Sequence, residues 1–132
     1  VIIFLSACGT PIKKEAPLFE GLGKLHFPVT TNSEEAQKYF NQGLILSYAF
    51  NHAEAYRSFK EASRLDSNCA MAYWGMALVL GPNINAAMEK GDVPTAYDAI
   101  EKAISLGLKE AIALQEMFLY LTTKFPELFE ES

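Results

Sequence analysis

Residues 36–69 read AQKYFNQGLILSYAFNHAEAYRSFKEASRLDSNC, and their apolar side chains return every three or four positions. That interval is typical of α-helices, and it is not the strict alternation that indicates a half-buried strand. Asn51 and His52 interrupt the pattern, so the segment divides into two helices, the second expected at 53–65. The apolar face of this second helix consists of Ala55, Tyr56, Phe59, Ala62 and Leu65. The sequence therefore predicts an all-α protein.

The flanks of this segment carry further helix signals. Before it, either Asn32 or Ser33 can cap the first helix, and Asn32 with Glu35 has the spacing of a reciprocal capping box. After it, a third helix is expected at 69–80, ended by the Gly-Pro-Asn turn that follows. A later helix is expected at 109–124, with an apolar face made of Ala111, Leu114, Met117, Phe118 and Leu121.

A period of 34 residues relates the first helix to the third. The pairs with this spacing are Tyr39 and Tyr73, Phe40 and Trp74, and Gly43 and Ala77. The second helix has the spacing A-x3-F-x2-A, and a similar spacing occurs further along the chain; the residues are Ala55, Phe59 and Ala62, then Ala96, Ile100 and Ala103. These residues resemble the tetratricopeptide repeat (TPR), in which aromatic and small residues on helices A and B let two antiparallel helices pack closely.

The resemblance implies a TPR-like α-α superhelix of antiparallel helix pairs over 32–125. Repeats would span about 36–69 and 70–108, with a partial third repeat from 109. The sequence departs from the motif at Ser67, where Pro is usual, and the second helix of repeat two comes seven residues late. An ordinary helical bundle with coincidental spacing is the alternative. A closer likeness is to bacterial TPR proteins that carry segments similar to AFNH, CAMAYWG and GPNIN.

The residues LSACG at positions 5–9 resemble the bacterial lipobox, in which an aliphatic and two small residues precede a cysteine. This likeness implies that the thiol of Cys8 carries diacylglycerol, that 1–7 is the remnant of a signal peptide, and that 8–31 tethers the lipid to the domain. Gly9 after the cysteine favours the outer membrane, facing the periplasm. A buried N-terminal strand with an incidental cysteine is the alternative. Part of the tether is expected to pack on the domain through Leu18, Phe19, Leu22, Leu25 and Phe27.

Composition narrows the function classes. The 132 residues are 50% hydrophobic and 20% charged, so one globular domain is expected rather than a disordered chain. A net charge of −5 without a cluster of cations argues against nucleic-acid binding. The chain has no phosphate-binding loop or nucleophile elbow, so no enzymatic activity, cofactor or metal is predicted.

The repeats imply an unpartnered end. Two and a half repeats leave the last helix without a neighbour, and repeat proteins bury their apolar faces only against neighbours. We therefore expect a fragment of a longer protein, with 126–132 as a tail or the start of a further region, or a chain that associates with itself through that helix.

In the TPR family, helix A side chains line a groove that holds extended peptides or partner helices. By motif position, this groove would contain Gln37, Phe40, Leu44, Ser47 and Tyr48 from the first repeat, and Met71, Trp74 and Leu78 from the second. Each of these residues is equally compatible with packing in the core. Asn83 and Asn85 could bind a ligand at the groove edge, or shape a turn. Phe40 and Leu44 replace two positions of the carboxylate clamp used by chaperone-tail-binding TPRs, so that ligand is not expected.

His52 and Cys69 could in principle form a nucleophile pair or half of a metal site. No other residues supply the remaining ligands at a suitable spacing, so a solvated or capping His52 and a packed Cys69 are predicted.

The function predicted is a lipid-anchored TPR scaffold that binds a protein or peptide partner at the bacterial cell envelope. One alternative is a glycan- or nutrient-binding outer-membrane lipoprotein, for which Trp74 is the sole stacking candidate. Another is the N-terminal part of a larger enzyme.

Overall fold

The computed structural model describes residues 14, 16–107 and 123–124. These residues form four α-helices, which are α1 (Glu34–Tyr48), α2 (His52–Leu65), α3 (Ala70–Leu80) and α4 (Val93–Ser105), and a single 3-10 turn, η1 (Lys90–Asp92). No strand occurs in the described part, where the only β-type pairing is an isolated bridge between Asn83 and Ala86. The predicted all-α class is therefore confirmed. The predicted helix at 109–124 lies outside the described residues except for its last two positions, as do Cys8 and 126–132.

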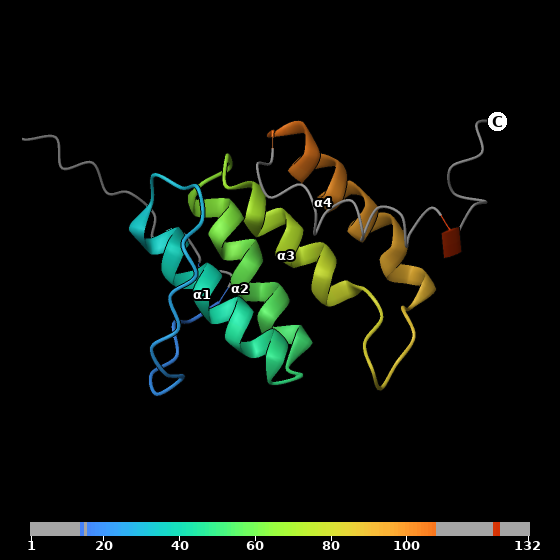
Figure 1. Cartoon of the computed structure of the whole chain (residues 1–132), viewed down its shortest axis with the longest axis horizontal. Coiled ribbons are helices and arrows are strands. Elements are labelled where there is room, and N and C mark those ends of the chain that lie inside the picture. The colour runs from blue at the N-terminus through green and yellow to red at the C-terminus, as the bar shows by residue number, and fades with distance from the viewer. Residues whose placement is uncertain (1–13, 15, 108–122, 125–132) are drawn as a thin grey trace, which may run out of the picture.

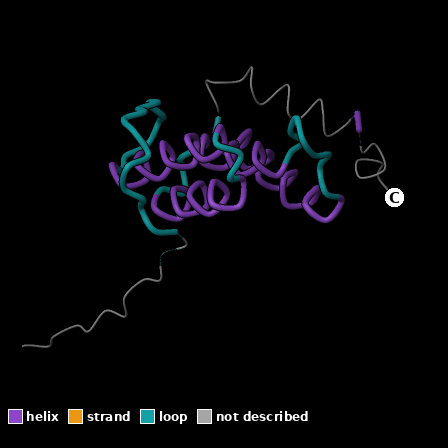
Figure 2. Tube along the Cα trace, turned by 90° about the horizontal axis from the view of Figure 1, so that it is seen from below, coloured by secondary structure: helices purple, strands orange, loops and turns teal. Residues whose placement is uncertain are grey.

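Consecutive helices run in opposite directions, and each packs against the next (Figure 1). Helix α1 also touches α3, so α2 covers one side of the pair that α1 and α3 make. Residues 16–31, which we call the strap, run alongside α1 at the end of the array that lies opposite α4 (Figure 2). The loop between α3 and α4 lies at the other side of the array (Figure 1).

Local capping explains where the helices begin and end. Of the two candidate caps of α1, Ser33 is the one used, because its side chain accepts a hydrogen bond from the Ala36 N–H at 3.1 Å. Asn51 caps α2 in the same way, and α3 ends at Leu80 with Gly81 as its C-cap. The starts of α2 and α3 therefore lie one residue from their predicted positions.

The core consists of two apolar clusters that meet at α3. The first joins α1 and α2 to α3 through Met71, Ala72 and Val79, and the second joins α3 to α4 through Ala77. Helix α3 has no charged residue, and a helix that is apolar all round is normally buried on all sides. Trp74 and Met76 contact both clusters, so α3 links the two halves of the array.

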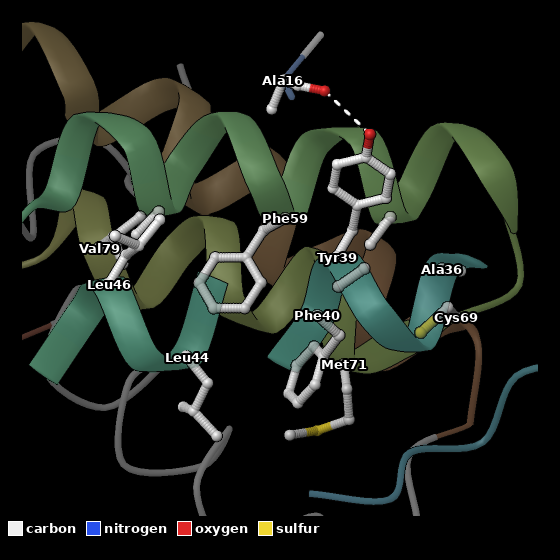
Figure 3. Close-up of a cluster of buried hydrophobic side chains, with 13 residues drawn as sticks. Ala16, Ala36, Tyr39, Phe40, Leu44, Leu46, Phe59, Cys69, Met71 and Val79 are labelled. Atoms are coloured by element: carbon white, nitrogen blue, oxygen red, sulfur yellow. Dashed lines mark hydrogen bonds between the residues drawn. The ribbon is translucent and has the colours of Figure 1, made fainter. Parts of the chain in front are cut away.

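Phe59 of α2 fills the junction between α1 and α3. Its side chain is completely buried, and the backbone of both neighbouring helices comes close to its ring because each has a glycine there. A Cβ atom placed on Gly43 would lie 2.8 Å from the ring, and one placed on Gly75 would lie 2.4 Å from it. Phe40 of α1 packs beside Phe59 with its ring centroid 5.5 Å away (Figure 3). The two glycines thus determine how closely the three helices pack.

Asp66, the C-cap of α2, ties the end of that helix to the start of α1. Its Oδ2 accepts hydrogen bonds from the Thr31 hydroxyl at 2.5 Å and from the Asn32 N–H at 3.1 Å. Its Oδ1 accepts one from the Asn68 N–H at 3.0 Å. The bond from Thr31, followed by those from the two backbone groups, lowers the pKa of the Asp66 carboxyl. The ionised form is therefore the one that stabilises the fold.

Asp66→Asn is expected to cost about 1–2 kcal/mol of unfolding free energy at pH 7, because it removes a charged acceptor of three hydrogen bonds. Since the folded pKa is lowered, this stabilisation is present above the unfolded pKa of about 3.9 and is lost as pH falls through the folded pKa. Urea denaturation between pH 3 and 7 should show that the free energies of unfolding of the variant and of the unchanged protein converge at the acid end. Asp98→Asn, on the exposed side of α4, is the control, and an equal pH dependence in all three proteins would contradict the assignment.

Candidate functional site

The strap is held on α1 through its backbone. Gln42 Oε1 accepts the Phe19 N–H at 2.7 Å, and Gln42 Nε2 donates to the Pro17 carbonyl at 2.8 Å. Gln37 repeats the arrangement further along the strap, since its Oε1 accepts the Val29 N–H at 3.0 Å and its Nε2 donates to the Phe27 carbonyl at 2.8 Å. Each carboxamide therefore binds the carbonyl of one residue and the N–H of the residue two positions later. In this pattern, one carboxamide side chain binds both a carbonyl and an N–H group of an extended main chain.

A third carboxamide lies between these two. Asn41 Oδ1 accepts the Phe27 N–H at 3.1 Å and also a bond from Gln37 Nε2 at 2.9 Å. We call Gln37, Asn41 and Gln42 the amide ladder. The Tyr39 hydroxyl adds a bond to the Ala16 carbonyl at 2.9 Å, and Ala16 is buried beneath it (Figure 3).

The amide ladder is fixed from behind by α2. Gln42 is 4% exposed, and its Nε2 donates a second hydrogen bond to Ser58 Oγ at 3.0 Å. The Ser58 hydroxyl in turn donates to the Glu54 carbonyl at 2.8 Å. Because a buried carboxamide without partners is costly, these contacts hold one orientation of the Gln42 side chain. The ladder is thus organised by the helices rather than by the strap alone.

Two cavities flank the amide ladder. One, of about 410 Å³, lies between the end of the strap and the first two turns of α1, and Gln37, Lys38 and Asn41 contribute to its wall. The other, of about 270 Å³, lies beside the loop of the strap, and Lys38, Asn41 and Gln42 contribute to its wall. Side chains that project from an extended segment on the ladder have space on both sides.

The sequence-predicted groove residues fall into different environments. Gln37 belongs to the amide ladder, and Tyr48 is 80% exposed at the end of α1. Phe40, Leu44 and Met71 are buried in the first cluster (Figure 3). Phe40 is completely enclosed, and its ring centroid lies 6.2 Å from that of Phe27. For these three residues the structure selects the core position over the groove position.

The remaining candidates are placed apart from the amide ladder. Trp74 is partly buried against both clusters, and in the part of the chain that the structure describes its indole N–H has no hydrogen-bond partner. The Asn83 side chain accepts bonds from the Asn85 N–H at 2.9 Å and the Ala86 N–H at 3.1 Å, so it shapes the turn after α3. Asn85 is exposed in that turn.

His52 and Cys69 do not form a pair. His52 begins α2 and Cys69 follows its end, and a helix of 14 residues separates them by about 20 Å. Cys69 is buried, as predicted. The prediction of a solvated or capping His52 is wrong, because both ring nitrogens are buried with no hydrogen-bond partner among the described residues, and Asn51 supplies the cap. Among the described residues, no three His, Cys, Asp or Glu side chains lie close enough to hold a metal ion.

Sequence reasoning missed Asn41, Gln42 and Ser58. The signal that could have found the two amides is a set of three carboxamides at positions 37, 41 and 42, within about one and a half turns of the first helix; no sequence signal indicates Ser58. Comparison with protein-family models, curated proteins and solved structures gave no match. In the part of the chain that the structure describes, no helix combines the length and the apolar character needed to cross a bilayer.

Proposed function

We propose that this protein is a lipid-anchored, TPR-like scaffold that binds an extended segment of a protein partner at the bacterial cell envelope. The observation that carries the proposal is the amide ladder with the strap on it. Gln37 and Gln42 form four hydrogen bonds to the strap, all with main-chain groups. Recognition of the main chain is tolerant of sequence, so the same ladder suits an extended segment from another protein.

The helix pairs support the TPR-like part of the proposal. Helices α2 and α4 carry the same spacing of small and large apolar residues, and all of these side chains are fully buried; they are Ala55, Phe59, Ala62, Ala96, Ile100 and Ala103. The alternating directions of α1 to α4 agree with two helix pairs in succession (Figure 1). The lipid anchor rests on the lipobox resemblance at Cys8.

The strap competes with a partner because it occupies the ladder from within the chain. Attached segments act at an effective concentration in the millimolar range, so an external peptide binds well only when the strap is loosened. Proline at positions 19 and 29 removes the two strap N–H groups that Gln42 and Gln37 accept. These changes leave the ladder itself intact.

The Phe19→Pro/Val29→Pro variant of the full chain is expected to bind a fluorescent peptide of residues 16–31 at least about tenfold more tightly than the unchanged protein does. Fluorescence anisotropy measures the affinity. Adding Gln37→Ala should abolish the gain, because this change removes the groups that bind Phe27 and Val29.

The matched control is Phe19→Ala/Val29→Ala, which shortens the same two side chains and keeps both N–H groups. This control should bind the peptide as weakly as the unchanged protein. Two results would contradict the proposal that the amide ladder binds main-chain groups. One is an equal peptide affinity in the proline and alanine variants, and the other is a gain in peptide affinity that persists with Gln37→Ala.

A further inference from the structure

Four large apolar side chains of the strap stay partly exposed while its backbone is held on α1. Leu18, Phe19, Leu25 and Phe27 are between 42% and 46% exposed. The Phe19 N–H is bonded to Gln42, and the Phe27 N–H is bonded to the neighbouring Asn41. Residues 19–27 therefore form a compact loop whose two ends meet on adjacent residues of α1. The loop projects away from the helices (Figure 2).

The conformation of this loop depends on two glycines. Gly21 has φ +81° and Gly23 has φ +95°, which are left-handed values that residues with a Cβ rarely adopt. No atom of the described residues lies within 4 Å of a Cβ placed on either glycine, so the tip has open space around it in this part of the structure. The loop is thus a shaped projection that exposes large apolar side chains at its base.

The charge around the loop differs from that of the chain as a whole. The chain carries a net charge of −5, but Glu20 is the only acidic residue in the strap. On the loop, the exposed Lys24 offsets the charge of the exposed Glu20, and Lys38 of α1, at the wall of the cavity beside the loop, adds a positive charge. A projection with apolar side chains and flanking lysines is complementary to an anionic membrane surface, which takes apolar groups into the headgroup boundary and attracts cations.

We propose that the loop of residues 19–27, together with the adjacent Leu18, docks onto an anionic lipid bilayer. This proposal rests on the proposed function, because the lipid anchor on Cys8 is what brings the loop close to a membrane. Nine residues separate Cys8 from Leu18, and a chain of that length spans at most about 35 Å. An anchor on Cys8 therefore keeps the loop within reach of the bilayer, where even a weak affinity suffices for docking. The amide ladder then lies next to the membrane.

The test uses the full chain with Cys8→Ser, so that binding is measured without acylation. This protein is expected to co-float with vesicles of phosphatidylethanolamine and phosphatidylglycerol, and not with vesicles of phosphatidylcholine alone. Phe19→Ser/Leu25→Ser should lower the partition coefficient at least about tenfold, because two half-exposed apolar side chains no longer enter the interface. Lys24→Glu, at an exposed position that leaves the apolar side chains in place, should also weaken binding.

The matched control is Ile84→Ser, which removes a side chain that is 88% exposed in the loop between α3 and α4. Because that loop lies on the other side of the array (Figure 1), this variant should bind vesicles like its parent. Circular dichroism shows whether each variant is folded.

Three results would overturn the docking proposal. They are no co-flotation, equal binding to phosphatidylcholine, and binding that neither Phe19→Ser/Leu25→Ser nor Lys24→Glu changes. Self-association through the loop, seen by sedimentation without lipid binding, would assign the surface to a second copy of the chain. Failure of the proposed anchor is seen separately, because labelled palmitate would then not be incorporated at Cys8 of the unchanged protein. Failure of the amide ladder is seen in the peptide assay, which contains no lipid.

Discussion

Gly75→Ala is expected to lower the free energy of unfolding by about 3 kcal/mol. A Cβ at this position would lie 2.4 to 2.6 Å from three atoms of the Phe59 ring, and Phe59 is completely buried between α1 and α3. The ring has little room to move away, because it is completely buried and the backbone of Gly43 also lies close to its Cδ1 and Cε1 atoms. The clash therefore exceeds the roughly 1 kcal/mol that alanine gains over glycine inside a helix. Chemical denaturation of the two proteins measures the difference.

A double-mutant cycle with Phe59→Leu isolates this contact. Leucine lacks the ring atoms that the new Cβ would meet, so Gly75→Ala should cost much less in the Phe59→Leu background, with a coupling energy of about 2 kcal/mol. Gly91→Ala is the control, because no atom lies within 4 Å of a Cβ at that position. Additive effects of Gly75→Ala and Phe59→Leu would show that the ring is not what excludes a side chain there.

This junction shows how far the sequence predicts the packing. The spacing of Ala55, Phe59 and Ala62 correctly indicates the buried face of α2, because spacing within one helix is a local property. It does not indicate that Phe59 meets Gly75, since the register between two helices depends on the shapes of both. Helix ends are also predictable from the sequence, because caps such as Ser33 act within a few residues and are therefore local as well.

The strap shows where sequence reasoning reaches its limit. Its apolar residues correctly suggested contact with the helices, and Leu22 packs against the first cluster. The hydrogen bonds that hold the strap, however, come from main-chain groups, and Leu18 and Phe19 stay 43% and 42% exposed. Every residue except proline offers the same N–H and C=O groups, so main-chain binding leaves no pattern in the strap. The pairing of Phe19 with Gln42 also spans 23 residues. The only readable signal was the set of carboxamides on α1.

Gln42→Glu is expected to destabilise the fold by about 3 kcal/mol at pH 7. Gln42 Nε2 donates to the Pro17 carbonyl and to Ser58 Oγ, and an ionised carboxylate has no proton to donate to either. The side chain is only 4% exposed, so the new charge would also lose its hydration. The strap would detach from α1 at Pro17 and Phe19, and hydrogen exchange at the Phe19 amide should quicken.

The cost of Gln42→Glu should depend on pH in the opposite sense to the contribution of Asp66. Burial raises the pKa of the new carboxyl group above its usual value of about 4.3. The neutral form is then favoured in the fold, so stability is retained below the unfolded pKa and lost as pH rises through the folded pKa. Denaturation at pH 4 and at pH 8 should show that the difference in free energy of unfolding between the variant and the unchanged protein is larger at pH 8.

Gln37→Glu is the matched control for this substitution, because it makes the same chemical change one and a half turns earlier on α1, at a half-buried position. It removes the donor to the Phe27 carbonyl but leaves the new carboxylate in contact with water, so a loss of about 1 kcal/mol is expected. An equal loss in the two variants, or a gap for Gln42→Glu that stays constant from pH 4 to 8, would mean that Gln42 is not the buried support of the strap. A larger loss of unfolding free energy for Gln42→Glu, which grows with pH, would show that the strap is stabilised mainly by the Gln42 carboxamide, which is hydrogen-bonded to Ser58.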